Sequence, residues 1–387
     1  MKAKLLRLTL LLPLFALFFG CRDEVKSTWL VEANSDPMEV YGVVDPIHDD
    51  RPVSEMTLEG VIKLVGKNLA NVDTVTINDV GLQIPFDAYV INGDLYLRVP
   101  YRAPIVIDNQ IKITDKYERT VTVPLVVTLP ALYADGLDFE WAAEGDQVNI
   151  TGNYFDLYGV TADDGTVTFG GLPATIIAAT KNTITVEVPA GATRDAAIVV
   201  SSPAGSATCS TPYRETTWLL GDFNGIAPSD NGNWHYQNTP RLTTSDPEPV
   251  DGIYLMYDAD YPGEWSGDNW GIYFVNPGNY PADINTNRAA YNFKFEAWVG
   301  VSNMYNNLRF EFEASAAECR VWWGESPGIP LYAWRTVTIP AEKIKGGGGD
   351  ADLGTAGPAF QMVMQGPTAC HMYLAIDNPR FSLKPVH

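Results

Sequence analysis

The sequence predicts an all-β protein, with two small β-sandwiches followed by a larger C-terminal β-domain. Short runs of alternating apolar and polar residues recur along the chain, and this period of two is typical of strands with one buried face. The last third of the chain, from residue 216 onward, shows no clear helical period. Eight of the ten tryptophans lie in this last third, interleaved with Asn, Asp, Gln, Arg and Gly.

Composition and charge limit the classes of partner. The chain has 387 residues, of which 46% are hydrophobic and 19% are charged, and this balance indicates folded domains with hydrophobic cores. The formal net charge of −21 repels phosphate backbones and anionic lipid headgroups. We therefore expect a neutral ligand, and we expect neither nucleic acid nor a peripheral membrane surface as a partner.

The N-terminus has the composition of a secretion signal. Three cations between residues 2 and 7 precede an apolar run over 8–19, which is too short to span a bilayer comfortably. A small residue, Gly20, then precedes Cys21. We therefore predict a cleaved signal peptide over residues 1–20 and not a transmembrane anchor.

The pair Gly20-Cys21 resembles the lipobox of bacterial lipoproteins, whose cysteine is acylated before cleavage. Residues 22–24, Arg-Asp-Glu, resemble the acidic tag that sends some lipoproteins to the outer face of the outer membrane. The resemblance implies lipidation of Cys21, a polar tether over 21–35, and a cell-surface location for the rest of the chain. An ordinary signal-peptidase site with a chance cysteine is the alternative.

Two segments of short strands repeat along the chain. Residues 60–69 and 145–155 share a glycine-punctuated alternation, and each is followed at a similar distance by a strand pattern that ends in proline. Both segments resemble the IPT/TIG family of immunoglobulin-like sandwiches, which implies such domains over 36–130 and 131–214. Neither segment contains an aromatic cluster, so we interpret both domains as rigid spacers.

Longer and more aromatic strands fill residues 215–387. Regular alternation predicts strands over 292–299, 307–313 and 335–340. Strands of this length in one domain suggest a jelly roll of two packed sheets. The closing run 376–381, Ile-Asp-Asn-Pro-Arg-Phe, is one of several motifs that resemble the galactose-binding-like jelly roll common among carbohydrate-binding modules.

The arrangement of these parts resembles the Sus-type surface glycan-binding proteins of polysaccharide-utilisation loci, in particular the second binding lipoprotein of xyloglucan and β-glucan systems. The resemblance implies that the C-terminal domain binds the polysaccharide and that the other domains project it from the membrane. It also implies a TonB-dependent outer-membrane importer and surface glycosidases as partners. The preference for β-glucan or xyloglucan comes from the resemblance alone.

Alternation separates core aromatic residues from candidate ligand contacts. In the strand 292–299, Phe293 and Phe295 share one face, whereas Glu296 and Trp298 lie on the other. A tryptophan among polar residues offers a flat apolar face to a sugar ring, whose C–H face is apolar and whose hydroxyls need hydrogen bonds. We therefore predict that Trp298 binds the glycan, with Glu296 beside it.

Other tryptophans of the C-terminal domain are candidates for the same reason. Trp322 and Trp323 are adjacent in a strand pattern, so that they point to opposite faces. Trp265 and Trp270 lie in a Gly/Asp/Asn-rich stretch that predicts a loop, where they either bind ligand or cap the sandwich. We assign three tryptophans to packing: Trp218, Trp234 and Trp334. The predicted glycan-binding set is Trp265, Trp270, Glu296, Trp298, Arg309, Trp322, Trp323, Gln361 and Gln365.

The sequence evidence for a catalytic site is weaker than that for a glycan-binding site. Glu311 and Glu313 share a strand face, as a glycosidase pair could, but solvated charge is the commoner reason for such a pair. Residues 324–328 match G-x-S-x-G, yet Pro327 has no N–H to donate to an oxyanion hole. We therefore expect a non-catalytic glycan-binding protein. The alternatives are a lipoprotein glycoside hydrolase and a protein-binding adhesin that uses the sandwich domains.

We expect no cofactor and no metal site, since the four histidines are scattered without ligand spacing. A structural calcium ion is left open, because many jelly rolls of this type carry one. Asp222 and Asp377 are the conceivable ligands.

Overall fold

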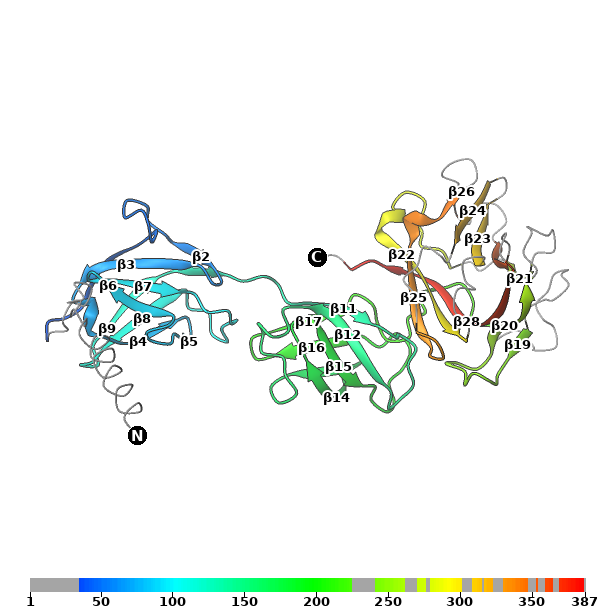
Figure 1. The fold of residues 1–387 in the computed structure, drawn as a ribbon, viewed down its shortest axis with the longest axis horizontal. Coiled ribbons are helices and arrows are strands. Elements are labelled where there is room, and N and C mark those ends of the chain that lie inside the picture. Colours follow the sequence, from blue (N-terminus) through cyan, green and yellow to red (C-terminus); the bar gives the residue numbers. More distant parts are fainter. Residues whose placement is uncertain are drawn as a thin grey trace, which may run out of the picture. The chain divides into compact units, whose positions relative to one another are not determined.

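The structure is a computed structural model, and it divides the chain into two compact units, Met1–Leu129 and Pro130–His387 (Figure 1). It describes residues 35–224, 241–261, 270–275, 279–300, 308–314, 317–322, 330–346, 353, 359–364 and 369–385. The regular elements of these residues are β-strands and short 3-10 helices. No helix in this described part of the chain is both long and apolar enough to cross a membrane.

The first unit contains two four-stranded sheets and one parallel pair of strands. The sheets are, in spatial order, β1 (Glu39–Val44), β3 (Val61–Lys67), β7 (Asp94–Arg98) and β6 (Ala88–Ile91), and β5 (Val80–Gly81), β4 (Val72–Ile77), β8 (Gln110–Asp115) and β9 (Thr120–Pro124). The pair is β10 (Val126–Thr128) with β2 (Glu55–Thr57), and the 3-10 helix η1 spans Leu69–Asn71. Alternation places Ile62 and Leu64 of β3 and Ile111 and Ile113 of β8 in the core, where all four are buried.

The second unit begins with a sandwich formed by one seven-stranded sheet. Its strands are, in spatial order, β11 (Tyr133–Leu137), β12 (Gln147–Asn153), β15 (Thr183–Glu187), β14 (Leu172–Ala179), β13 (Thr166–Phe169), β16 (Ile198–Ser202) and β17 (Gly205–Thr208). The first half of β14 pairs with β13 and its second half pairs with β15, with a register shift between Ile176 and Ala178. A strand shared in this way lets the sheet fold around one core, which contains the fully buried Trp141. We refer to these strands, with the segments that join them, as the second sandwich.

The rest of the second unit, the C-terminal domain, has two packed sheets. The six-stranded sheet contains β19 (Arg241–Thr243), β20 (Tyr254–Tyr261), β28 (Cys370–Leu383), β22 (Tyr291–Val299) and β25 (Arg335–Pro340), with β18 (Trp218–Leu219) also paired to β28. The five-stranded sheet contains β21 (Trp270–Val275), β27 (Ala359–Met364), β23 (Leu308–Ala314), β24 (Ala317–Trp322) and β26 (Lys345–Gly346). Two 3-10 helices complete it, η2 (Arg288–Ala290) and η5 (Ala341–Lys343).

Aromatic side chains fill the space between these two sheets. The ring of Phe295 lies 4.6 Å from that of Phe310, and the ring of Phe293 lies 5.1 Å from that of Phe312. Trp218 packs at the margin of this core, as predicted, in an edge-to-face contact with Tyr291. The structure thus confirms the all-β fold class and the buried face expected for β22.

The predicted strands agree closely with the observed ones, with one correction. The strand expected over 335–340 has those bounds in β25, and the closing motif 376–381 forms part of the long strand β28. The expectation that Trp270 lies in a loop is wrong, because Trp270 begins β21 and pairs with Met364.

Candidate functional site

Strand ends of both sheets gather at one end of the C-terminal domain. In the six-stranded sheet, β20 ends at Tyr261 opposite Cys370, where β28 begins. In the same sheet, Ala297 near the end of β22 pairs with Arg335, where β25 begins. The register therefore places the ends of β20 and β22 at the same end of the sheet as the starts of β25 and β28.

The five-stranded sheet shows the same arrangement. Met364, which ends β27, pairs with Trp270 at the start of β21 and with Leu308 at the start of β23. Trp322, which ends β24, pairs with Arg309. Four chain connections join these strand ends between the sheets, and we call this part of the domain the aromatic end. Three predicted residues, Trp265, Trp323 and Gln365, belong to these connections and lie outside the described residues.

Trp298 lies at the aromatic end within a cluster of rings. Its ring makes edge-to-face contacts with Tyr373, at 5.1 Å between centroids, and with Tyr332, at 5.8 Å. Trp298 itself is only 8% exposed, whereas Tyr332 is 67% exposed. Trp334 packs against the same cluster, which agrees with the packing role predicted for it. The accessible ring of this cluster is therefore that of Tyr332, with Trp298 supporting it from beneath.

Local backbone geometry fixes these rings. Tyr332 has a φ of 58°, in the left-handed region, and its N–H donates a hydrogen bond to the carbonyl of Val299 at 2.8 Å. Gly300 lies beside the rings, and a Cβ added there would come within 2.0 Å of the Tyr373 ring. Glycine is therefore needed at 300, because any larger residue would displace the cluster.

Polar side chains lie next to Trp298 on the same face of the six-stranded sheet. The register pairs Asp258 with Tyr373 and Asp260 with His371 on this face. His371 Nδ1 and Asp260 Oδ1 are 2.9 Å apart, and all three polar side chains are substantially exposed. The arrangement combines an aromatic surface with carboxylate and imidazole groups that can hydrogen-bond to hydroxyls.

Sequence reasoning missed five of these residues: Tyr332, Tyr373, Asp258, Asp260 and His371. The alternation in β20 and β28 could have identified all of them except Tyr332. Those four residues share one face of the sheet, and the buried Leu255, Tyr257 and Leu374 lie on the other. Tyr332 lies outside any strand, so period-two reasoning could not select it.

The register of the five-stranded sheet places three other predicted residues close together. Arg309 and Trp322 occupy one row of the register, and Gln361 pairs with Glu311 in the next row. These positions alternate with Phe310 and Val321, which are buried in the core. The three residues are therefore neighbours in the sheet, and their glycan contacts stay predictions.

Glu296 corrects the sequence-based expectation. All nine residues of β22 are buried, because the second sandwich covers the outer face of this strand. Glu296 has no exposed surface, and its carboxylate accepts hydrogen bonds from Arg380 Nη1 at 2.6 Å and from Thr336 Oγ1 at 2.9 Å. Glu296 therefore cannot contact a ligand in this arrangement and acts as an internal counter-ion. Alternation separates two strand faces, but it does not tell whether another domain covers the second one.

The described residues offer little support for a metal. No group of three or more His, Cys, Asp or Glu side chains in the described part of the chain is arranged to hold a metal ion. Asp377 is fully buried, and burial raises the pKa of its carboxyl well above the usual range. Asp222 and Asp377 therefore do not belong to such a group. The G-x-S-x-G stretch and Cys21 lie outside the described residues.

Two family models match the second unit. Residues 213–382 match the model described as the surface glycan-binding protein B xyloglucan binding domain. Residues 138–214 match the model of the IPT/TIG domain. A comparison with curated proteins finds no match.

A comparison with solved structures finds, among others, two surface glycan-binding proteins. PbSGBP-B from Prevotella bryantii is 19% identical, with a TM-score of 0.57 over 90% of this chain and 99% of that chain. SGBP-B from a complex xyloglucan utilization locus in Bacteroides uniformis is 14% identical, with a TM-score of 0.47 over 90% of this chain and 100% of that chain. At this level of identity, the likeness to PbSGBP-B establishes a shared fold.

Proposed function

Because residues 213–382 form a domain of the surface glycan-binding protein B xyloglucan-binding type, preceded by an IPT/TIG domain, we propose that this chain captures a neutral polysaccharide at the cell surface. The C-terminal domain is the glycan-binding part. We propose β-glucan or xyloglucan as the ligand, since one similar structure contains a xylogluco-oligosaccharide and another a mixed-linkage heptasaccharide. Both of those ligands are neutral, which agrees with the strongly negative charge of this chain.

The observation that carries this proposal is the aromatic end. Both sheets bring strand ends there, and Trp270, Trp298 and Trp322 lie at or next to those ends. The exposed ring of Tyr332, supported by Trp298, can stack on a sugar, while the neighbouring Asp258, Asp260 and His371 can bind hydroxyls. Binding by stacking and hydrogen bonds needs no cofactor and no covalent step.

We propose that the protein is not an enzyme, and several observations support this. The matched family model describes a binding domain, and PbSGBP-B is named as a binding protein. A glycosidase needs two carboxylates about 5 to 9 Å apart beside the scissile bond, one of them as a general acid. Glu296, the predicted site acid, is enclosed by Arg380 and Thr336 and is unavailable to a substrate.

The remaining parts of the proposal concern location and partners. We propose that Cys21 carries the lipid, that residues 21–35 tether the protein to the outer face of the outer membrane, and that a TonB-dependent importer and surface glycosidases receive the captured chain. The lipobox-like pair at Gly20-Cys21 and the acidic residues after it support this placement. Palmitate labelling in a bacterial host should label the wild type and not Cys21→Ala, and unchanged labelling of the variant would overturn the anchor.

The experiment that tests glycan binding is affinity electrophoresis of residues 22–387 in gels that contain single neutral polysaccharides. We expect one glucan to retard the wild type, and Trp298→Ala and Trp322→Ala to migrate faster in the same gel. Tyr41→Ala is the matched control, because Tyr41 is an exposed aromatic residue of the first unit. Unchanged wild-type mobility in every glycan gel would overturn the proposed function.

A further inference from the structure

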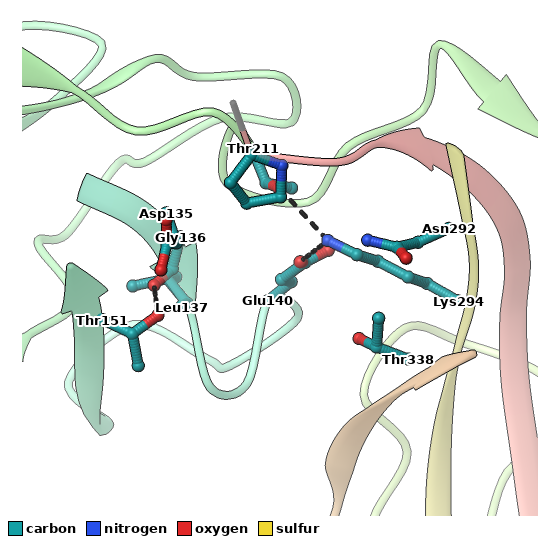
Figure 2. A pocket seen from close by; sticks show the side chains of 10 residues that line it. Asp135, Gly136, Leu137, Glu140, Thr151, Thr211, Asn292, Lys294 and Thr338 are labelled. Atoms are coloured by element: carbon teal, nitrogen blue, oxygen red, sulfur yellow. Dashed lines mark hydrogen bonds and ion pairs between the residues drawn. The ribbon is translucent and has the colours of Figure 1, made fainter. Parts of the chain in front are cut away.

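The second sandwich inserts one acidic side chain into the C-terminal domain. Glu140 lies in the segment between β11 and β12, and its side chain is 3% exposed. Lys294 of β22 donates its Nζ to Glu140 Oε1 at 2.5 Å and to Thr211 Oγ1 of the second sandwich at 3.1 Å (Figure 2). Figure 2 shows Glu140 and Lys294 meeting at the boundary between the two domains.

Glu140 also contacts the two strands that flank β22. Arg380 of β28 donates its Nη2 to Glu140 Oε2 at 2.5 Å. The backbone N–H of Glu140 donates to Thr336 Oγ1 of β25 at 2.8 Å. One residue of the second sandwich is therefore bonded to β22, β25 and β28, three adjacent strands of the covered sheet.

Charge balance explains why an acid is required at this position. Lys294 and Arg380 are both buried, and among the described residues of the C-terminal domain Glu296 bonds directly to Arg380. Glu215, a second buried acid, lies near both cations. Glu140 supplies, from outside the domain, a negative charge that is bonded to both cations. A buried cation without a partner is strongly unfavourable, so the position of Glu140 relative to the three strands is tightly defined.

The same strands carry the rings of the aromatic end. Trp298 follows Glu296 by two residues on the same face of β22, and Trp334 precedes Thr336 by two residues. Trp334 packs against the cluster that contains Trp298 and also against the core of the second sandwich. Its indole N–H donates to the carbonyl of Glu248 at 2.7 Å. The covered face and the ring cluster are thus one continuous packed arrangement.

We propose that Glu140 is a positioning residue of the glycan-binding site, through which the second sandwich holds β22, β25 and β28 so that the rings at the aromatic end keep one geometry. This inference rests on the proposed function. Glu140 does not touch the glycan. It acts on affinity because a site that is already ordered loses less entropy when the ligand binds. The IPT/TIG-like sandwich is then part of the binding apparatus and not only a spacer.

Two variants separate positioning from stability. Glu140→Leu removes the carboxylate that is bonded to both Lys294 and Arg380, so it lowers both thermal stability and affinity. Glu140→Leu/Lys294→Leu removes one charge of each sign, and apolar replacements of a buried pair are often neutral or stabilising. A cavity of about 160 Å³ beside the pair, lined mostly by polar residues of both domains, leaves space for the altered side chains (Figure 2).

The experiment measures thermal unfolding and glycan affinity of residues 22–387, with affinity taken by calorimetric titration of the glucan that retards the wild type. We expect the double variant to regain the thermal midpoint of the wild type but to bind about threefold to tenfold more weakly. Glu187→Gln, an exposed acid of the second sandwich, should change neither quantity.

Affinity that returns to the wild-type value together with the thermal midpoint would overturn the positioning role, and so would unchanged affinity in both Glu140 variants. In either case the proposed function would stand. A wild-type protein that binds no neutral polysaccharide would overturn the proposed function, and the positioning role would fall with it.

Discussion

Arg380 and Glu140 belong to different domains, yet Nη2 of the first donates to Oε2 of the second at 2.5 Å, and neither side chain is exposed by more than 3%. Arg380 also bonds Glu296, so two carboxylates share one guanidinium. Burial raises the pKa of Glu140, but Lys294 and Arg380 outweigh burial and lower it overall. Burial also raises the pKa of Glu296. The attraction of Arg380 for this carboxylate is too weak to offset burial, so the pKa of Glu296 rises to about 6.

We predict that Arg380→Met destabilises the second unit by about 3 to 5 kcal/mol, because two buried carboxylates lose their shared cation. Urea unfolding followed by tryptophan fluorescence measures this, since most tryptophans lie in the second unit. The control is Arg98→Met, which breaks an ion pair with Glu59 in which both side chains are about half exposed. An exposed pair contributes about 1 kcal/mol at most, so equal effects of the two variants would contradict the prediction.

Glu296 predicts a pH dependence of stability. Its folded pKa of about 6 lies above the ordinary value of 4.5, so between these pH values the folded state holds a proton that the unfolded state releases. The contribution of Glu296 to folding stability therefore falls as the pH rises through this window and does not change further at higher pH. The ionisation of Glu296 across this window lowers the free energy of unfolding by about 2 kcal/mol in total.

Unfolding midpoints measured from pH 4.5 to pH 7 test this dependence, with Glu296→Gln as the comparison. The variant has no carboxyl at position 296, so the difference between the two curves reports the titration of Glu296 together with its coupling to the buried Asp377, whose pKa Glu296 helps to raise. Parallel curves for wild type and Glu296→Gln would show that Glu296 does not titrate in this range.

Gly300→Ala should disturb the ring cluster. The added Cβ would lie 2.0 Å from the Tyr373 ring and 2.9 Å from the Trp298 ring, so at least one ring must move. We expect a loss of about 1 to 3 kcal/mol in stability, together with weaker glycan binding. Gly42→Ala is the control, because a Cβ there would meet nothing within 4 Å. A Gly300→Ala protein with wild-type stability and affinity would show that the cluster does not constrain residue 300.

Tyr332→Ala should lower glycan affinity while leaving stability nearly unchanged. Tyr332 is 67% exposed and touches Trp298 by one ring edge, so its removal takes away a ligand surface and little core packing. The loss of one stacked ring should cost about 1 kcal/mol of binding free energy, or about fivefold in Kd. Phe86→Ala removes a similarly exposed ring from the first unit and should not affect binding. Calorimetric titration of both variants with the glucan that the wild type binds measures these affinities. Equal Kd values for Tyr332→Ala and Phe86→Ala would exclude Tyr332 from the site.

Much of the C-terminal domain could be predicted from strand periodicity. Alternation assigned Phe293, Phe295 and Phe310 to the core, and all three are fully buried. The same rule misled for Glu296, whose polar face is covered by the second sandwich. Tyr332 escaped prediction because its position depends on a left-handed turn outside any strand.

The sequence alone determined which strands form and which side chains share a strand face, because those properties depend on a period of two within short segments. It also determined the concentration of tryptophan in one domain and the negative charge that favours a neutral ligand. Only the tertiary structure decided that Glu140 balances Lys294 and Arg380, and that Trp298 lies beneath Tyr332. These relationships join residues far apart in the chain, so packing between strands and domains creates them and no local pattern encodes them.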